Sequence, residues 1–169
     1  MISFHEYLLE QSGLKSIPWD GAPTIGWWED QNPLRMYHGS NARHLESFAK
    51  DGLNRKDSST GMISLAFDPF TARAFAVMGG EAEFRKAGAK AKTVPENQRI
   101  TVVFEIPKPF IIAHQDPDLR GNDPEHLKRL TDQSVYETWT GSDQQYYQLC
   151  ELRLNAVVPA KYIVGYMIK

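Results

Sequence analysis

The feature that most constrains the fold is an apolar stretch at residues 34–41, which stops abruptly at His38-Gly39-Ser40. A helical pattern follows at once over residues 42–52, with apolar side chains three and four positions apart and a glycine at its end. The pattern predicts a strand that leads directly into a helix. Such a strand delivers an imidazole, a bare backbone and a hydroxyl to one edge of a sheet.

Two residues of this stretch are suited to binding a ligand. Because Gly39 lacks a Cβ atom, a planar ligand could lie against the main chain and bond to its N–H and C=O groups. His38 can donate a hydrogen bond from one ring nitrogen at neutral pH without a full charge. A purely structural role for a histidine at a strand end is the alternative, and this stretch alone leaves both open.

Length and charge exclude some classes of protein. A chain of 169 residues favours one domain that buries about two-thirds of its unfolded surface. The 19 basic and 21 acidic residues give a net charge of −2, so no global basic field points to nucleic acid or an anionic membrane.

The cysteine and histidine residues indicate which cellular compartment and which metal chemistry to expect. Cys150 is the single cysteine, so no internal disulfide is possible. No apolar run approaches the about 20 residues that span a bilayer, and the first residues do not have the pattern of a secretory signal. We therefore expect a cytoplasmic protein without contact to a membrane. The histidines outside the central stretch show no ligand spacing, so no metal site is expected; they are His5, His44, His114 and His126.

The remaining pattern alternates strands and helices. Strands are predicted at residues 34–41, 62–67, 99–106, 110–113, 148–154 and 162–168. Helices are predicted at residues 4–13, 42–52, 68–80, 81–94 and 123–132, with Asp-Pro pairs as start signals for two of them. This balance predicts an α+β fold with a mainly antiparallel sheet.

The chain divides into an N-terminal part at residues 1–33 and a domain at residues 34–169. The first part is a helix followed by a proline- and glycine-rich arm whose tryptophans are expected to pack on the domain, although stacking on bases is the alternative. Within residues 1–10, the triplet Leu8-Leu9-Glu10 is similar to the cleavage site of targeting segments in internal head proteins of tailed phages. A helix simply docked on the domain is the other interpretation.

Three motifs resemble the ADP-ribosyltransferase fold, in its His-containing branch of poly(ADP-ribose) polymerases and diphtheria-toxin-like enzymes. The first is Tyr37-His38-Gly39-Ser40, followed by a helix and Gly52-Leu53. The second is the strand-helix unit with Ile63-Ser64-Leu65-Ala66 and Ala72-Arg73-Ala74-Phe75. The third is Glu151, which opens a late strand before the segment 157–163. The resemblance covers residues 34–169 and implies a split antiparallel β-sheet core with peripheral helices.

The resemblance also implies a role for each motif residue. His38 would bind the 2′-hydroxyl of the adenine-side ribose of NAD, Gly39 would hold the nicotinamide amide through its backbone, and Ser40 would assist with the adenosine half. Phe75 would stack on the nicotinamide ring in place of the tyrosine common in the family. Glu151 would bond the 2′-hydroxyl of the nicotinamide ribose and stabilise the oxocarbenium-like sugar that forms when nicotinamide leaves.

The chain departs from the family pattern at two positions. Ser64 replaces a tyrosine and is similar to the serine that orients the catalytic glutamate in the arginine-containing branch, so it joins the predicted NAD-binding residues. Leu149 stands two residues before Glu151, where arginine-modifying members have Glu or Gln, and this disfavours arginine as the acceptor.

The function that the resemblance implies is mono-ADP-ribosyl transfer, a glycosyltransferase reaction with NAD as co-substrate and no metal. The acceptor is a protein or a nucleic acid, and its choice would lie in the loops at residues 54–61 and 139–147. If the protein is phage-encoded, it would act in the host cytoplasm and could be packaged in the virion. Two alternatives stay open: a non-catalytic NAD- or ADP-ribose-binding module or phage internal structural protein, and a tRNA 2′-phosphotransferase-like enzyme.

Overall fold

A computed structural model of the chain describes residues 4–19, 33–54, 61–77, 93–114 and 151–169. Several predicted features lie outside these residues. They are Trp27, Trp28, the segment 81–92, the helix at 123–132, the loop at 134–147, and Leu149 and Cys150.

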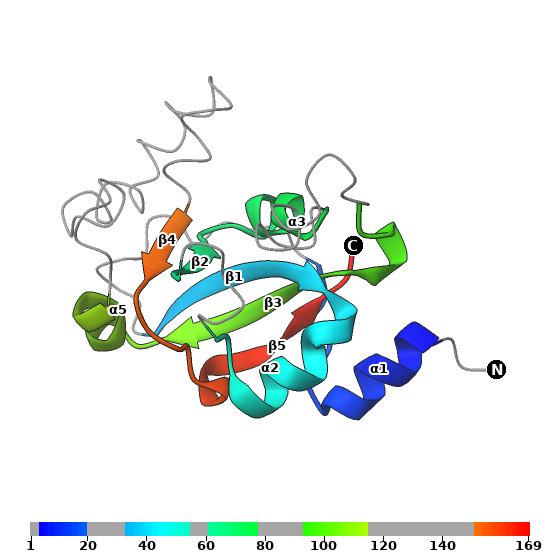
Figure 1. The fold of residues 1–169 in the computed structure, drawn as a ribbon, viewed down its shortest axis with the longest axis horizontal. Coiled ribbons are helices and arrows are strands. Elements are labelled where there is room, and N and C mark those ends of the chain that lie inside the picture. The colour runs from blue at the N-terminus through cyan, green and yellow to red at the C-terminus, as the bar shows by residue number, and fades with distance from the viewer. Residues whose placement is uncertain (1–3, 20–32, 55–60, 78–92, 115–150) are drawn as a thin grey trace, which may run out of the picture.

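The described chain builds a five-stranded sheet in the order β4-β2-β1-β3-β5 (Figure 1). The strands are β1 (Leu34–Asn41), β2 (Ile63–Ala66), β3 (Arg99–Ile106), β4 (Glu151–Leu154) and β5 (Ile163–Met167). All neighbouring strands are antiparallel, and β1 pairs with β3 along its whole length, from Leu34 opposite Ile106 to Asn41 opposite Arg99. The predicted α+β class with a mainly antiparallel sheet is confirmed, and β1 lies at its centre.

Helices connect and cover the strands. They are α1 (Phe4–Ser12), α2 (Leu45–Asp51), α3 (Pro69–Val77) and α5 (Lys108–His114), with 3₁₀ turns η1 (Ala42–His44), η4 (Glu96–Gln98) and η6 (Ala160–Tyr162). Asp68 caps α3 as predicted, because its carboxylate accepts hydrogen bonds from the backbone N–H and the hydroxyl of Thr71 at 2.8 and 2.6 Å. Gly52 ends α2 with a φ of 73°, a conformation in which glycine carries no steric cost.

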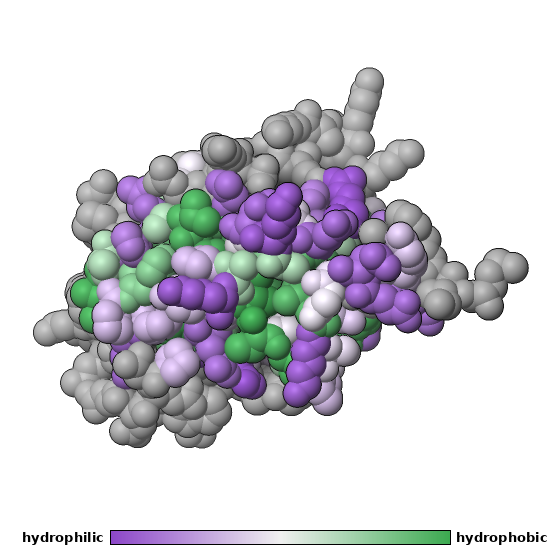
Figure 2. Space-filling model, turned by 90° about the horizontal axis from the view of Figure 1, so that it is seen from below, coloured by the Kyte–Doolittle hydropathy of each residue, from purple (hydrophilic) through white to green (hydrophobic). Residues whose placement is uncertain are grey.

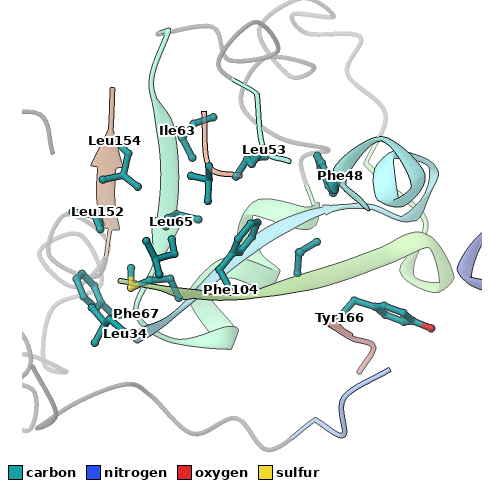
Figure 3. Packing of buried hydrophobic residues seen from close by; sticks show 14 of the residues in the cluster. Leu34, Phe48, Leu53, Ile63, Leu65, Phe67, Phe104, Leu152, Leu154 and Tyr166 are labelled. Atoms are coloured by element: carbon teal, nitrogen blue, oxygen red, sulfur yellow. The ribbon is translucent and has the colours of Figure 1, made fainter. Parts of the chain in front are cut away.

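Alternation along β1 gives the sheet two apolar faces. Met36 and Phe104 belong to a larger cluster on one face, whereas Tyr37, Val103 and Met167 belong to a smaller cluster on the other. Figure 3 shows the larger cluster, to which α2 contributes Phe48 and in which side chains of β2 and β4 pack beside those of β1 and β3. The two faces are therefore covered by different helices.

Helix α3 supplies the smaller face, where Ala72 is buried, and it lies across the sheet from α2 in Figure 1. The side of the molecule seen from below in Figure 2 shows hydrophobic residues between hydrophilic ones. The exposed large hydrophobic residues of the described chain come from several elements; they are Tyr7, Phe70, Ile112, Val157 and Ile168.

The prediction of a strand at residues 110–113 was wrong, because these residues form the helix α5. The backbone N–H groups of Phe110 and Ile111 both donate to the carbonyl of Pro107, which closes the first turn. Burial does not alternate, since Ile111 is fully buried whereas the next two residues, Ile112 and Ala113, are both exposed. The ring of Phe110 contacts that of His114 one turn later, with centroids 4.5 Å apart and the planes tilted by 55°.

The N-terminal arm is partly built into the domain. The backbone N–H of Ile17 donates to the carbonyl of Tyr166, and the N–H of Tyr166 donates to the carbonyl of Lys15, so this segment extends the sheet beyond β5. Trp19 then packs against the smaller cluster and meets Phe70 edge to face, with centroids 5.3 Å apart. The predicted packing of the arm on the domain is thus confirmed for Trp19.

The Leu8-Leu9-Glu10 triplet lies inside α1. Among the residues described, no helix has the length and apolar character needed to cross a membrane.

Candidate functional site

His38 is held in a defined orientation by the neighbouring strand. Its Nδ1 atom lies 3.0 Å from the backbone oxygen of Ser64 on β2. A carbonyl oxygen can only accept, so Nδ1 carries the hydrogen and donates it, and Nε2 of the neutral ring is left as an acceptor. The half-buried ring also meets Phe48 edge to face, with centroids 6.0 Å apart.

Burial lowers the pKa of His38 below its ordinary value of 6.5. The hydrogen bond to the Ser64 carbonyl opposes this lowering of the pKa, whereas positive charge on His44 adds to it. His38 is therefore neutral at pH 7. The sequence suggested that His38 donates to a ligand, but its donor already serves Ser64. The ring instead offers the Nε2 lone pair, which accepts a hydrogen bond from a hydroxyl such as that of a ribose.

Gly39 lies directly under helix α3. A Cβ atom at this position would come within 1.6 Å of the carbonyl oxygen of Ala72 and 2.8 Å of the backbone nitrogen of Ala76. The missing side chain therefore admits the helix backbone, which is a packing reason that the sequence argument did not foresee. A ligand can reach Gly39 only along the strand edge and not over this face.

Backbone pairing between β1 and β2 stops after Tyr37. Within the described residues, Tyr37 and Ala66 form the one paired position between β1 and β2, whereas pairing of β1 with β3 continues to Asn41. At the next residue, the His38 side chain takes over by bonding to the Ser64 carbonyl. Backbone groups on this edge are thus candidates for the contacts that the sequence assigned to Gly39.

Glu151 occupies a defined place relative to His38. It opens β4 as predicted and pairs with Ala66 of β2, which in turn pairs with Tyr37 of β1. Because neighbouring strands are about 4.8 Å apart, the backbones of Tyr37 and Glu151 are separated by about 10 Å. Ser64, two residues before Ala66, lies on the strand between them. The sheet thus places the backbones of His38, Ser64 and Glu151 on three consecutive strands. By alternation, His38 stands on the face of the larger cluster, whereas Ser64 and Glu151 occupy register positions of the face that carries Tyr37 and Ala66.

Comparison of the chain with family models, curated proteins and solved structures found no match. The functional argument therefore depends on the residues themselves and on their arrangement.

Phe75 and Ser40 differ in how well they could reach a ligand. Phe75 is half-buried and belongs to neither hydrophobic cluster of the described residues, although it directly precedes Ala76, which packs over Gly39. The partly exposed ring has surface that a stacking ligand could contact. Ser40 is only 4% exposed, so its hydroxyl presents little surface to a ligand.

Sequence reasoning did not foresee that His44, bonded to Arg43, would lie against the same ring of Phe48 as His38. Nε of Arg43 donates to Nε2 of His44 over 3.2 Å, and the His44 ring lies 6.1 Å from the ring of Phe48, between centroids. The Asn41 side chain, which accepts from the backbone N–H of Arg43, is the signal that could have indicated a turn here. Across the described ranges, no group of three or more His, Cys, Asp or Glu side chains is arranged to hold a metal ion.

Proposed function

We propose that this protein is an NAD-dependent mono-ADP-ribosyltransferase, which moves ADP-ribose from NAD to a protein or nucleic-acid acceptor. The observation that carries the proposal is the register of the sheet. It aligns Tyr37, Ala66 and Glu151 across three strands, with His38 next to this row and oriented by Ser64. His38 and Glu151 stand at positions of opposite sheet faces, so a dinucleotide would contact both by passing the edge of β1 where its pairing with β2 stops after Tyr37.

The reaction breaks the bond between C1′ of the nicotinamide ribose and the nicotinamide nitrogen. The bonding electrons leave with nicotinamide, and the ribose acquires oxocarbenium character that a carboxylate stabilises. A nucleophile of the acceptor then bonds to C1′ and releases its proton. We assign the carboxylate role to Glu151, which would act through the 2′-hydroxyl of this ribose.

The other residues position the dinucleotide. Nε2 of His38 would accept a hydrogen bond from a hydroxyl of the adenine-side ribose, because its Nδ1–H is already donated to Ser64. The backbone of Gly39 would hold the carboxamide at the strand edge, and Phe75 would stack on the nicotinamide ring. Holding the reacting groups in one geometry lowers the barrier by reducing the entropy lost on reaction.

The test measures two products with NAD labelled in its adenosine half. The purified protein is incubated with NAD and with defined protein, DNA and RNA acceptors, and both free nicotinamide and macromolecule-bound label are measured. We expect both products with the natural chain and a loss of about 10²- to 10³-fold in rate for Glu151→Gln.

A matched control is Glu105→Gln, the same change at a carboxylate of β3 that forms an ion pair with Arg35 of β1. We expect this variant to keep the rate. If NAD binds to the natural chain but neither nicotinamide nor bound label appears with any acceptor, the transferase proposal fails and a binding module takes its place. Equal rates for Glu151→Gln and the natural chain would remove Glu151 from the mechanism.

A further inference from the structure

The side chains that helix α3 buries are all small. They are Pro69, Thr71, Ala72 and Ala76. The helix backbone also lies so close to β1 that even a Cβ atom at Gly39 would clash with it. Small side chains remove little apolar surface from water, so α3 gains little from its own buried face. Contacts made elsewhere on α3 therefore matter more for holding the helix in place.

The N-terminal arm supplies such contacts through one large side chain. Trp19 packs against the smaller cluster, which includes Ala72, and meets Phe70 of α3 edge to face, with ring centroids 5.3 Å apart. The guanidinium of Arg73, one turn further along α3, lies 5.9 Å from the centre of the Trp19 ring. Nζ of Lys169 lies 5.5 Å from the Trp19 centroid and 4.7 Å from that of Phe70. Trp19 thus contacts two successive turns of α3.

The place of Trp19 is fixed by β5 and not by the helix. The backbone N–H of Ile17 donates to the carbonyl of Tyr166 over 2.8 Å, and the N–H of Tyr166 donates to the carbonyl of Lys15 over 2.9 Å. A Cβ atom at Gly165 would come within 2.2 Å of the same Lys15 oxygen, so this glycine makes room for the arm. The arm is therefore attached to one edge of the sheet and reaches α3 from there.

Helix α3 carries a residue that the proposed site needs, whereas His38 is held independently of it. Phe75, which we assign to stack on the nicotinamide ring, lies on α3. His38 lies on β1 and is oriented by the carbonyl of Ser64 on β2. A displacement of α3 would therefore move Phe75 and leave His38 in place.

We propose that Trp19 is a positioning residue, through which the N-terminal arm holds α3 and the ring of Phe75 where the nicotinamide half of NAD binds. The inference rests on the proposed use of NAD and gives the arm a part in it. Because the arm acts on one helix, its loss affects the nicotinamide half of the ligand and spares the adenosine half. A residue that merely stabilises the fold would affect both halves alike.

The first experiment compares two ligands that differ by nicotinamide. Calorimetry measures the affinities of NAD and ADP-ribose in the Glu151→Gln background, in which we expect NAD to be consumed slowly. We expect Trp19→Ala to weaken NAD by about two- to tenfold, the range of one aromatic contact, with the affinity for ADP-ribose unchanged. Trp19→Phe, which keeps an aromatic ring, should retain most of the affinity for NAD.

Two further variants separate this effect from a general loss of stability. Phe70→Ala removes the other ring of the pair at a position that is 50% exposed, so it should reproduce the selective effect with little harm to the fold. Phe110→Ala is the matched control, because it removes a half-buried ring that packs against the larger cluster and contacts the rings of His114 and Tyr162. We expect it to leave both affinities unchanged.

The second experiment needs no ligand. Native-state hydrogen exchange measures how often α3 opens. We expect the amides of α3 to exchange faster in Trp19→Ala than in the natural chain, by a factor similar to the loss of NAD affinity, and to keep their rate in Phe110→Ala. Equal acceleration in the two variants would mean that α3 opens only with the whole domain and would overturn the inference.

The binding results decide the inference separately from the proposed function. Equal weakening of NAD and ADP-ribose in Trp19→Ala would make Trp19 a purely structural residue, and unchanged affinities would remove it from the site. Either result leaves the proposed use of NAD standing. If the natural chain binds neither ligand, the proposed use of NAD fails and the positioning role fails with it, whereas hydrogen exchange still shows whether the arm holds α3.

Discussion

Gly39→Ala is expected to be strongly destabilising because of how closely α3 approaches β1. The added Cβ atom would lie 1.6 Å from the carbonyl oxygen of Ala72, and ordinary contact begins at 3.4 Å, so the helix would have to retreat by about 1.8 Å. The atoms in the way belong to the helix backbone and cannot rotate aside. Overpacking typically costs about 1 to 3 kcal/mol, and we expect the upper end of that range, about 3 kcal/mol.

For a chain of this length, that loss lowers the melting temperature by about 6 to 12 °C. Thermal and urea unfolding of Gly39→Ala measure it, without any ligand. The control is Gly13→Ala, where φ is +65° and no atom lies within 4 Å, so only a conformational cost of about 1 to 2 kcal/mol is expected. Adding Ala72→Gly should not rescue Gly39→Ala, because the clash is with a carbonyl. A Gly39→Ala protein as stable as the natural chain would refute the close approach.

Two further perturbations test the cap of α3 and the state of His38. Asp68→Ala removes both hydrogen bonds to Thr71 and should lower the free energy of unfolding, measured in urea, by about 1 to 2 kcal/mol. Asp68→Asn keeps one acceptor oxygen and should lower it by less. Burial lowers the pKa of His38, so the unfolded chain binds a proton more readily than the folded one, and the natural chain should lose stability as pH falls below 6.5. The His38→Gln variant should lose less stability over that pH range than the natural chain. If the unfolding free energies of the two proteins ran parallel from pH 7.5 to pH 5.5, the lowered pKa of His38 would be contradicted.

The sequence predicted the elements whose ends carry strong local signals. Strand β3 begins and ends where the pattern placed it, because a β-branched stretch is followed directly by Pro107. Helix α3 begins after Asp68 because its side chain caps the first turn whatever the rest of the fold does. Gly52 ends α2 at a positive φ, which is a local signal, but the missing Cβ atom there also admits the backbone of Val158, which the sequence does not predict.

Long-range pairing could not be predicted in the same way. The contact between His38 and Ser64 joins residues 26 positions apart, and it depends on how β2 aligns with β1. A shift of one residue in that alignment would turn every side chain of β2 to the other face. The helix at Phe110 was missed for a related reason, because short apolar runs fit a strand or a helix equally well until one knows which side is buried.

The three residues of the His-Gly-Ser motif are under different constraints, and this matters for how far the motif supports a function. Gly39 is required by the approach of α3, so a protein that binds nothing would also need a glycine there, and Ser40 is buried and presents little surface to a ligand. His38 differs, because it shares its face of β1 with Met36, which belongs to the larger cluster. An apolar side chain there would avoid the cost of burying an imidazole that needs Ser64 as a partner. The presence of a polar ring at this one position, with an acceptor nitrogen available and Glu151 two strands away, is therefore better evidence for a ligand than the glycine beside it.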